Sequence, residues 1–308
     1  MTAPLYLPRG SAAEKADPVA VTPELAGWSY SGLRVIELAQ GERRELRTGP
    51  AELAVLPLAG GCVVECDSHR FTLEGRDHVF ARVTDFAYLP MDAEARISSP
   101  GGGRFALPSA LARRRLEPAY GPPGEVPVEL RGAGQASRQV NNFLAPDAFP
   151  ADRLVSVEVL TPRGNWSSYP PHKHDQQRPP EEAQLEEIYY FEIADAGPES
   201  RGGPGGRLVP PRSTRGFGFH HLYTADGEIN LTETVADGDV VLIPRGYHGP
   251  SVAAPGYHMY YLNVLAGPAP QRTMAFCDDP AHGWVRASWA GRPVDPRLPL
   301  TGPGGSSQ

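Results

Sequence analysis

The sequence predicts an all-β protein made of two similar β-barrels in one chain. Long stretches alternate apolar and polar residues, as strands with one buried face do. Glycine and proline are both abundant, at 34 each, and they favour many turns and short strands over long helices. The two halves also carry matching segments. A chain of 308 residues is long enough for two domains of ordinary size.

The strand pattern divides the chain into three parts. Alternation runs through the first hundred residues and fades before a proline-rich segment at 116–127, where we place the domain boundary. We therefore expect a first barrel over 1–130, a second over 131–290 and a disordered tail over 291–308. A glycine- and proline-rich stretch at 194–215 predicts a long surface loop within the second barrel.

Two pairs of segments support an internal duplication. Asp85–Pro90 matches Asp239–Pro244 in pattern, and from 85 to 239 the offset is 154 residues. Glu52–Leu56 matches Glu187–Phe191, and from 52 to 187 the offset is 135 residues. The loop of the second half accounts for the difference between the offsets. Together the matches favour a repeated β domain.

Charge and cysteine content limit the function. The formal net charge is −7 and the isoelectric point is about 5.7, so we expect no nucleic-acid partner, although a local basic pocket could still bind a small anionic substrate. No segment resembles a signal peptide or reaches membrane-spanning length. The three cysteines, Cys62, Cys66 and Cys277, form no CxxC pair, which favours a reducing compartment. We expect a cytoplasmic protein without a membrane partner.

Two segments of the second half carry potential metal ligands. His172 and His174 are two residues apart, so in a strand both imidazoles point to the same face. Glu187 begins the next apolar strand, and His248 follows a tight Pro-Arg-Gly turn. Three imidazoles and one carboxylate suit Zn, Mn, Fe, Co or Ni, with positions left open for water or substrate. We predict one divalent metal ion per chain at these four residues, with Zn or Mn favoured.

This arrangement resembles the two motifs of the cupin superfamily. It departs from them in the longer spacing between His174 and Glu187 and in the single residue, Tyr247, before His248. The first departure leaves Glu186 and Glu182 as alternative ligands.

The first half of the chain offers no comparable set of ligands. It has His69 and His78 without an HxH pair, so the resemblance implies a metal-free barrel packed against a metal-binding one. The whole would be a bicupin with one working site.

Longer segments of the second half resemble the 5-deoxy-glucuronate isomerase family. The resemblance implies conversion of 5-deoxy-D-glucuronate to 5-dehydro-2-deoxy-D-gluconate in myo-inositol catabolism, an aldose–ketose isomerisation. A cupin isomerase acting on 5-keto-4-deoxyuronate, a cupin dioxygenase and a non-catalytic sugar-binding cupin are the alternatives. The segments are Thr161–Asp175, Leu185–Tyr190, Gly218–His221, Val241–His248, Tyr260–Val264, Asp278–Pro280 and Trp284.

The implied reaction requires proton carriers and a cation for the substrate's carboxylate. His221, Glu186 and Tyr261 are the candidate proton carriers. His221 follows another histidine on a strand, so only one of the two can face the barrel interior. Arg138 and Arg245 are the candidates for the carboxylate, because a guanidinium offers it two parallel donors.

Two further expectations concern the surroundings of the site. Lys173 lies between two inward-facing histidines, so strand alternation predicts a solvated lysine that points outward. Assembly into a homo-oligomer is compatible with the sequence but not required by it, since two barrels in one chain already resemble a dimer of single barrels.

Overall fold

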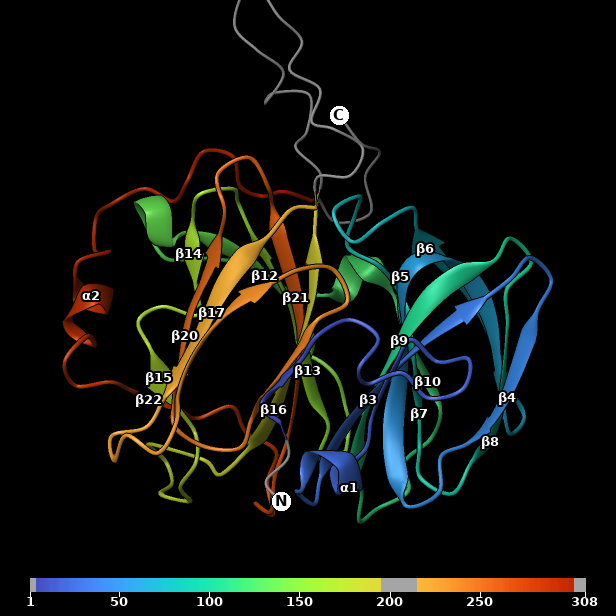
Figure 1. The fold of residues 1–308 in the computed structure, drawn as a ribbon. Coiled ribbons are helices and arrows are strands. Elements are labelled where there is room, and N and C mark those ends of the chain that lie inside the picture. The colour runs from blue at the N-terminus through green and yellow to red at the C-terminus, as the bar shows by residue number, and fades with distance from the viewer. Residues whose placement is uncertain (1–3, 195–214, 302–308) are drawn as a thin grey trace, which may run out of the picture.

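The structure, a computed structural model, describes residues 4–194 and 215–301, and it consists of two β-barrels that lie side by side (Figure 1). Helices are short in this part of the chain: α1 (Pro23–Ala26), α2 (Trp284–Ala287) and two 3-10 turns, η1 (Pro123–Glu125) and η2 (Gly134–Ala136). None of the described helices has the length and apolar character needed to cross a membrane. The expected all-β architecture of two barrels is present.

The first barrel is built around one long, bent strand. Its main sheet has the order β10-β7-β5-β9-β3-β2, and the far end of β5 pairs with β6 and β8, while β4 pairs with β8. Apolar side chains fill the interior of this barrel. The strands are β2 (Val19–Val21), β3 (Ser31–Leu38), β4 (Arg43–Arg47), β5 (Ala51–Cys66), β6 (His69–Arg76), β7 (Phe86–Leu89), β8 (Glu94–Ser98), β9 (Gly103–Leu111) and β10 (Ala119–Gly121).

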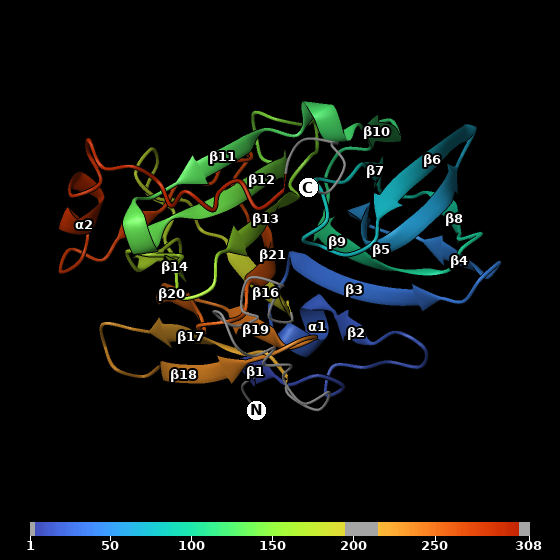
Figure 2. The same cartoon turned by 90° about the horizontal axis from the view of Figure 1, so that it is seen from above.

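The second barrel has two facing sheets, which Figure 2 shows from above. The first sheet, in spatial order, is β1 (Tyr6–Leu7), β19 (Val240–Ile243), β16 (Glu186–Ile193), β21 (Met259–Ala266), β13 (Val155–Thr161), β12 (Arg138–Leu144) and β11 (Val128–Arg131). The second is β18 (Asn230–Val235), β17 (Gly218–Tyr223), β20 (Tyr247–Ala253), β15 (His172–Lys173) and β22 (Cys277–Asp278), with β14 (Trp166–Ser167) paired to β20.

The expected division of the chain needs correction at both ends. Strand β1 pairs with β19, so the first described residues complete the second barrel rather than the first. The expected disordered tail is wrong for residues 291–301: Asp295 accepts a hydrogen bond from Asn165, and the buried Thr301 hydroxyl accepts one from Gln139. Residues 302–308 and most of the predicted loop at 194–215 lie outside the described residues.

The two halves share strand order, which supports the predicted duplication but shifts its register. The order β7-β5-β9-β3 corresponds to β19-β16-β21-β13. Leu53 pairs with Leu89 as Glu187 pairs with Ile243. Because Leu89 and Ile243 occupy the same place in the matched segments, Leu53 is the counterpart of Glu187. The first barrel therefore holds an apolar residue where the second holds a predicted metal ligand, and the matching carboxylates are Glu52 and Glu186.

Glu52 and Glu186 join the barrels reciprocally. The carboxylate of Glu52 accepts hydrogen bonds from the backbone N–H groups of Asp152, Arg153 and Leu154, at 2.8, 2.5 and 2.6 Å. The carboxylate of Glu186 accepts them from residues 29–31, at 2.8, 2.7 and 2.8 Å. A carboxylate of each barrel thus binds the backbone N–H groups that lead into a strand of the other barrel.

A common apolar core completes the contact between the barrels. Leu33, Val35 and Leu56 of the first barrel belong to the same buried cluster as Ile188 and Leu262 of the second. Each of these side chains is almost completely removed from water. The barrels are therefore packed as one body rather than linked by a flexible hinge.

Candidate metal centre

The four predicted metal ligands come together inside the second barrel. His172 lies on β15 opposite His248 on β20, and Glu187 lies near the start of β16. The ligand atoms of His174, Glu187 and His248 all lie within 4.8 Å of one another, and these three residues are buried. The ring of His172 is centred 4.5 Å from that of His248 and 6.4 Å from that of His174.

Backbone carbonyl groups orient all three imidazoles in the same way. The Nδ1 atoms of His172, His174 and His248 lie 3.3, 3.1 and 3.3 Å from the carbonyl oxygens of Pro170, Leu185 and Gly246. A carbonyl can only accept, so each Nδ1 carries a proton and each Nε2 is the nitrogen left to face the cluster. Metal-binding histidines commonly have this arrangement, because the second nitrogen fixes the tautomer and the ring orientation.

The contacts of Glu187 fit a cation shared between the ligands. Its Oε2 lies 2.9 Å from His174 Nε2 and 3.0 Å from His248 Nε2, but the His248 nitrogen has no hydrogen bond of acceptable geometry. Burial would raise the pKa of Glu187, yet the neighbouring imidazoles of His248 and His174 lower it strongly. The group is thus a carboxylate with imidazole nitrogens converging on it, which fits a divalent ion of the type predicted.

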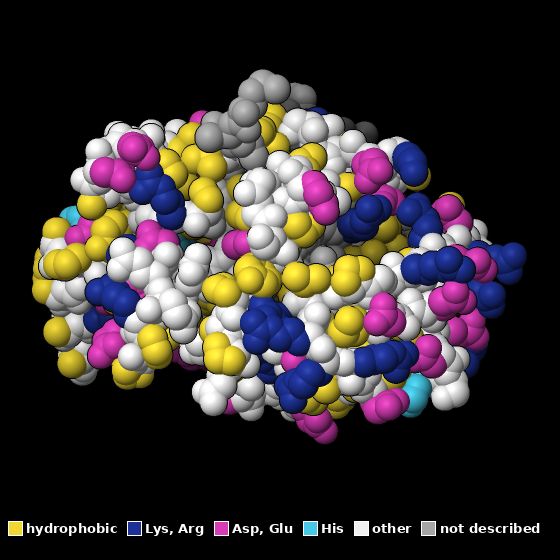
Figure 3. All heavy atoms as spheres, turned by 90° about the horizontal axis from the view of Figure 1, so that it is seen from below, with side chains coloured by type: hydrophobic (Ala, Val, Ile, Leu, Met, Phe, Trp, Pro, Cys, Tyr) yellow, Lys and Arg dark blue, Asp and Glu magenta, His cyan; other side chains and the backbone are white. Residues whose placement is uncertain are grey.

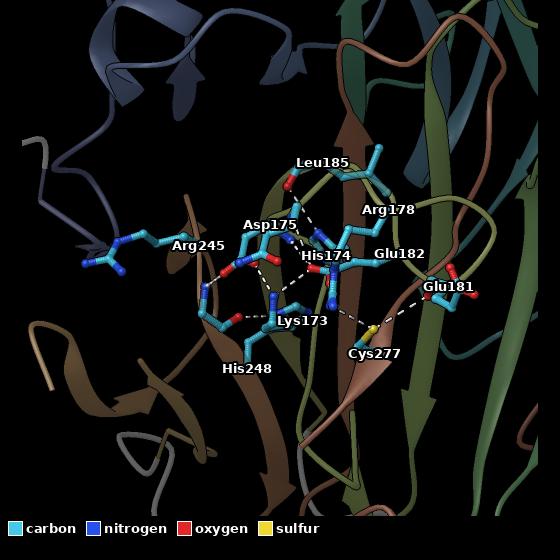
Figure 4. Close-up of polar contacts among 12 residues, drawn as sticks. Lys173, His174, Asp175, Arg178, Glu181, Glu182, Leu185, Arg245, His248 and Cys277 are labelled. Carbon is cyan, nitrogen blue, oxygen red and sulfur yellow. Dashed lines mark hydrogen bonds and ion pairs between the residues drawn. The ribbon is translucent and has the colours of Figure 1, made fainter. Parts of the chain in front are cut away.

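A network of charged groups beside the ligands settles the role of Glu182. Its Oε1 accepts hydrogen bonds from Lys173 at 2.8 Å and from the backbone N–H groups of Asp175 and Gln176 at 2.9 and 3.0 Å (Figure 4). Its other oxygen pairs with Arg178. Glu182 therefore supports the HxH segment and does not contribute to the ligand cluster, and Glu186 is occupied at the barrel interface.

The same network corrects the expectation for Lys173. Its side chain points away from the histidines, as alternation predicts, but it is only 12 % exposed and pairs with Asp175 and Glu182. Asp175 also accepts a hydrogen bond of 2.8 Å from the backbone N–H of Gly246. These contacts tie the HxH segment to the turn before His248, so the two motifs hold each other in place.

A pocket next to the ligand cluster contains two more predicted residues. Arg138 and Tyr261 line it together with His172, His174 and Glu187. The buried guanidinium of Arg138 donates to the carbonyl of Ala136 at 3.0 Å and forms no ion pair with a described residue. Burial lowers its pKa to about 10. A buried cation without an acidic partner at a pocket wall is suited to an anionic ligand.

Three predicted catalytic or binding residues lie elsewhere. Glu186 belongs to the barrel interface. His221 points out of the barrel, with its Nδ1 2.7 Å from the hydroxyl of Thr232, because its neighbour His220 takes the inward position. Arg245 pairs with Asp226 at 2.9 Å and with Glu228, and its side chain extends away from the histidines (Figure 4). The structure thus places these three residues outside the pocket beside the ligand cluster.

Sequence reasoning also missed several residues of the pocket. Arg131, Asn263 and Tyr189 line it, and Arg131 pairs with Arg138 in the β11–β12 ladder. Asn263 lies two residues beyond Tyr261, and Tyr189 two beyond Glu187, so strand alternation could have placed both on the inner face. His220, rather than the predicted His221, is the buried member of the histidine pair. Its ring is centred 4.7 Å from Tyr189, and burial lowers its pKa to about 3.

A larger hollow on the first barrel does not match the predicted site. It measures about 910 Å³ and is lined by charged side chains that pair with one another, such as Arg47 with Glu94 at 2.8 Å and Arg96 with Glu45 at 3.3 Å. Figure 3 shows basic and acidic side chains close together over the part of this barrel that it draws. These exposed pairs leave no uncompensated charge comparable to that of Arg138.

Comparison with known proteins places the chain in a family. The model of the KduI/IolB family matches residues 5–285. The chain belongs to the KduI/IolB family. It is 41 % identical over 286 residues to the 5-deoxy-glucuronate isomerase of Geobacillus kaustophilus HTA426, covering 92 % of this chain and 96 % of the relative. It is 37 % identical over 270 residues to the enzyme of the same name from Bacillus subtilis 168, covering 86 % and 91 %.

Solved structures confirm the fold. An IolB-like protein from Salmonella typhimurium LT2 superimposes with a TM-score of 0.79 at 31 % identity, covering 92 % of this KduI/IolB chain and 99 % of the other. An oxalate decarboxylase variant of Bacillus subtilis gives a TM-score of 0.58 at 13 % identity, covering 90 % and 80 %. At that identity the second likeness concerns the fold alone. The bicupin architecture expected from the sequence is confirmed.

Proposed function

We propose that this chain is a metal-dependent 5-deoxy-glucuronate isomerase that converts 5-deoxy-D-glucuronate to 5-dehydro-2-deoxy-D-gluconate. One observation carries the proposal beyond family membership: the same pocket has a cluster of metal ligands at one wall and an unpaired buried guanidinium at another. A six-carbon aldehyde acid has an aldehyde at one end, which suits a metal ion, and a carboxylate at the other end, which suits a guanidinium. The relatives that bear this name span most of the chain, which supports the same reaction here.

The residues His172, His174, Glu187 and His248 would hold one divalent ion, with Zn or Mn favoured. When bound, such an ion polarises the carbonyl group and makes the hydrogen on the neighbouring carbon more acidic. The protein's own part is to orient the imidazoles through backbone carbonyl groups and to keep the ring of His172 neutral. Burial and the charges of the other two histidines lower the pKa of His172 well below its usual value, which keeps its lone pair available.

The reaction moves one hydrogen from the carbinol carbon to the former aldehyde carbon, while the hydroxyl proton passes between the two oxygens. No electrons are gained or lost overall. Tyr261 is the one predicted proton carrier that lines the pocket. Burial raises its pKa to about 12, so it remains a phenol and can donate a hydrogen bond to a substrate oxygen. Arg138 would bind the carboxylate and fix which end of the substrate faces the metal.

The test is to incubate purified protein with 5-deoxy-D-glucuronate in deuterated water and to follow the reaction by proton NMR. We expect the 2-deoxy-5-keto acid to appear, to stop appearing after chelation, and to return when a divalent metal is added. Conversion of 5-keto-4-deoxyuronate instead would assign the related isomerase reaction. Dioxygen consumption with Fe(II), or binding without product, would refute the isomerase proposal.

A further inference from the structure

The pocket-facing side chains follow a fixed chemical order across the main sheet of the second barrel. Arg138 and Val140 lie on β12, and the next strand, β13, contributes Val157 and Val159. Strand β21 follows with Tyr261 and Asn263, and β16 with Glu187 and Tyr189.

The strand register makes the valines of β13 direct neighbours of Val140, Tyr261 and Asn263. Val140 pairs with Val159, and Val159 with Tyr261; on the adjacent row Val157 pairs with Asn263. Paired residues on one face of an antiparallel sheet have Cβ atoms about 5 Å apart. The chemistry of the pocket wall therefore changes from strand to strand. Strand β12 provides the cation, β13 the apolar surface, β21 the hydrogen-bonding groups, and β16 the metal ligand.

The valines form a dry band in the middle of this order. Val140, Val157 and Val159 are only 3, 4 and 6 % exposed. Asn142, a polar residue that also lines the pocket, lies close enough to Glu129 to help lower its pKa. A substrate group that rests on the valines thus finds methyl groups and no hydrogen-bond partner from β13.

The proposed substrate has the same order of groups along its chain. 5-Deoxy-glucuronate carries a carboxylate, then a methylene at C5, then three carbons with hydroxyl groups, then the aldehyde. We propose that it lies across the strands with its carboxylate at Arg138 and its C5 methylene against Val157 and Val159. This assignment rests on the proposed function and deepens it, since it makes the two valines the residues that select a substrate lacking the C5 hydroxyl.

The physical reason is the cost of an unpaired hydroxyl. D-Glucuronate is the same acid with a hydroxyl at C5, and in this orientation that group would lose its water against valine methyls. Apolar pockets reject an added hydroxyl by about 100-fold in kcat/KM. Threonine has nearly the shape of valine but offers a hydroxyl partner, so a threonine on β13 should reduce this discrimination.

The experiment compares kcat/KM for 5-deoxy-D-glucuronate and D-glucuronate in the metal-loaded wild type, Val157→Thr and Val159→Thr. Ring closure of glucuronate through O5 affects every enzyme form equally, so the change in the ratio of the two constants is what matters. We expect at least one of the variants to lower the ratio about tenfold. The matched control is Val155→Thr, because Val155 is buried on the same strand but does not line the pocket.

Each outcome decides the matter. A ratio that stays constant in both folded, metal-loaded pocket variants overturns the orientation, and so does an equal change in Val155→Thr. If the wild type converts the 5-deoxy acid while the ratio does not respond, the proposed function survives and this inference fails. If the wild type converts neither acid, both fall.

Discussion

At the scale of single residues, the proposed reaction depends on a few buried polar side chains. One lacks an acidic partner, and the others are held in place by backbone carbonyl groups. Arg138 has a carbonyl partner but no carboxylate, and its guanidinium is also 5.5 Å from the ring of Trp289. The three histidines each have one nitrogen engaged by a carbonyl. Such groups are costly to bury without a ligand, and that cost is recovered when the ligand binds.

We expect Arg138→Met to lower kcat/KM for 5-deoxy-D-glucuronate about 30- to 150-fold, mainly through KM, because it removes a charge-assisted hydrogen bond worth roughly 2–3 kcal/mol. Arg138→Lys should recover only part of the loss, since lysine keeps the charge but not the paired donors. Steady-state kinetics provide the measurement. Arg245→Met is the control, because Arg245 pairs with acidic groups away from the pocket. Equal effects of both methionine variants would contradict the assignment of Arg138.

Metal content tests the ligand set without relying on activity. Elemental analysis of the purified protein should find about one divalent ion per chain, and His174→Gln or His248→Gln should lose most of it, because each removes a nitrogen donor. His221→Gln should keep it, since His221 faces away from the cluster. Retention of the metal in both ligand variants would show that the ion binds elsewhere.

At the scale of secondary-structure elements, the last described segment reinforces the second barrel. Asp295 bonds to Asn165 and pairs with Arg297, whose guanidinium also reaches Asn165 at 3.0 Å. The hydrogen bond from Arg297 is the largest of the influences that lower the pKa of Asp295 to about 2. A buried carboxylate thus fastens residues that the sequence presents only as a proline-rich end.

The pH dependence of this contact has a definite sign. Because the folded-state pKa of Asp295 is depressed, its contribution to stability is present above the ordinary pKa near 3.8 and is lost as the pH falls towards 2. We expect Asp295→Asn to lower the free energy of unfolding by about 2 kcal/mol at pH 6 and by much less at pH 2.5. Denaturant unfolding at several pH values measures this difference. Asp77→Asn, which changes an exposed carboxylate that forms no ion pair with a described residue, should show no such trend.

The sequence predicts strands and ligands well where local pattern decides the geometry. The i, i+2 spacing of His172 and His174 and the turn before His248 determine which way these side chains point. It predicts poorly where a distant segment decides. Glu186 and Glu187 are neighbours with the same charge, and only the register against β19 and the presence of the other barrel show that one faces the ligands and the other the interface. His220 and His221 present the same ambiguity.

At the scale of the whole molecule, duplication has separated two tasks that a single barrel would have to combine. The second barrel carries the ligand cluster, while the first has Leu53 at the position of Glu187 and an apolar interior. Both retain the carboxylate one residue earlier, and each uses it to cap the other barrel's backbone. The first barrel therefore stabilises the second through the hydrogen bonds of Glu52, and the second stabilises the first through those of Glu186.

Glu186→Gln distinguishes this structural role from the catalytic role that the sequence suggested. Replacing a carboxylate that accepts three backbone hydrogen bonds with an amide should cost about 2–4 kcal/mol and lower the melting temperature by about 5 °C or more. Glu52→Gln should cause a similar loss, because its contacts are equivalent. Calorimetry gives the melting temperatures, and kcat/KM per folded, metal-loaded molecule should stay within about twofold of the wild type. If Glu186→Gln instead abolished turnover at an unchanged melting temperature, the carboxylate would have to act in the reaction, and the reciprocal contact would not explain its presence.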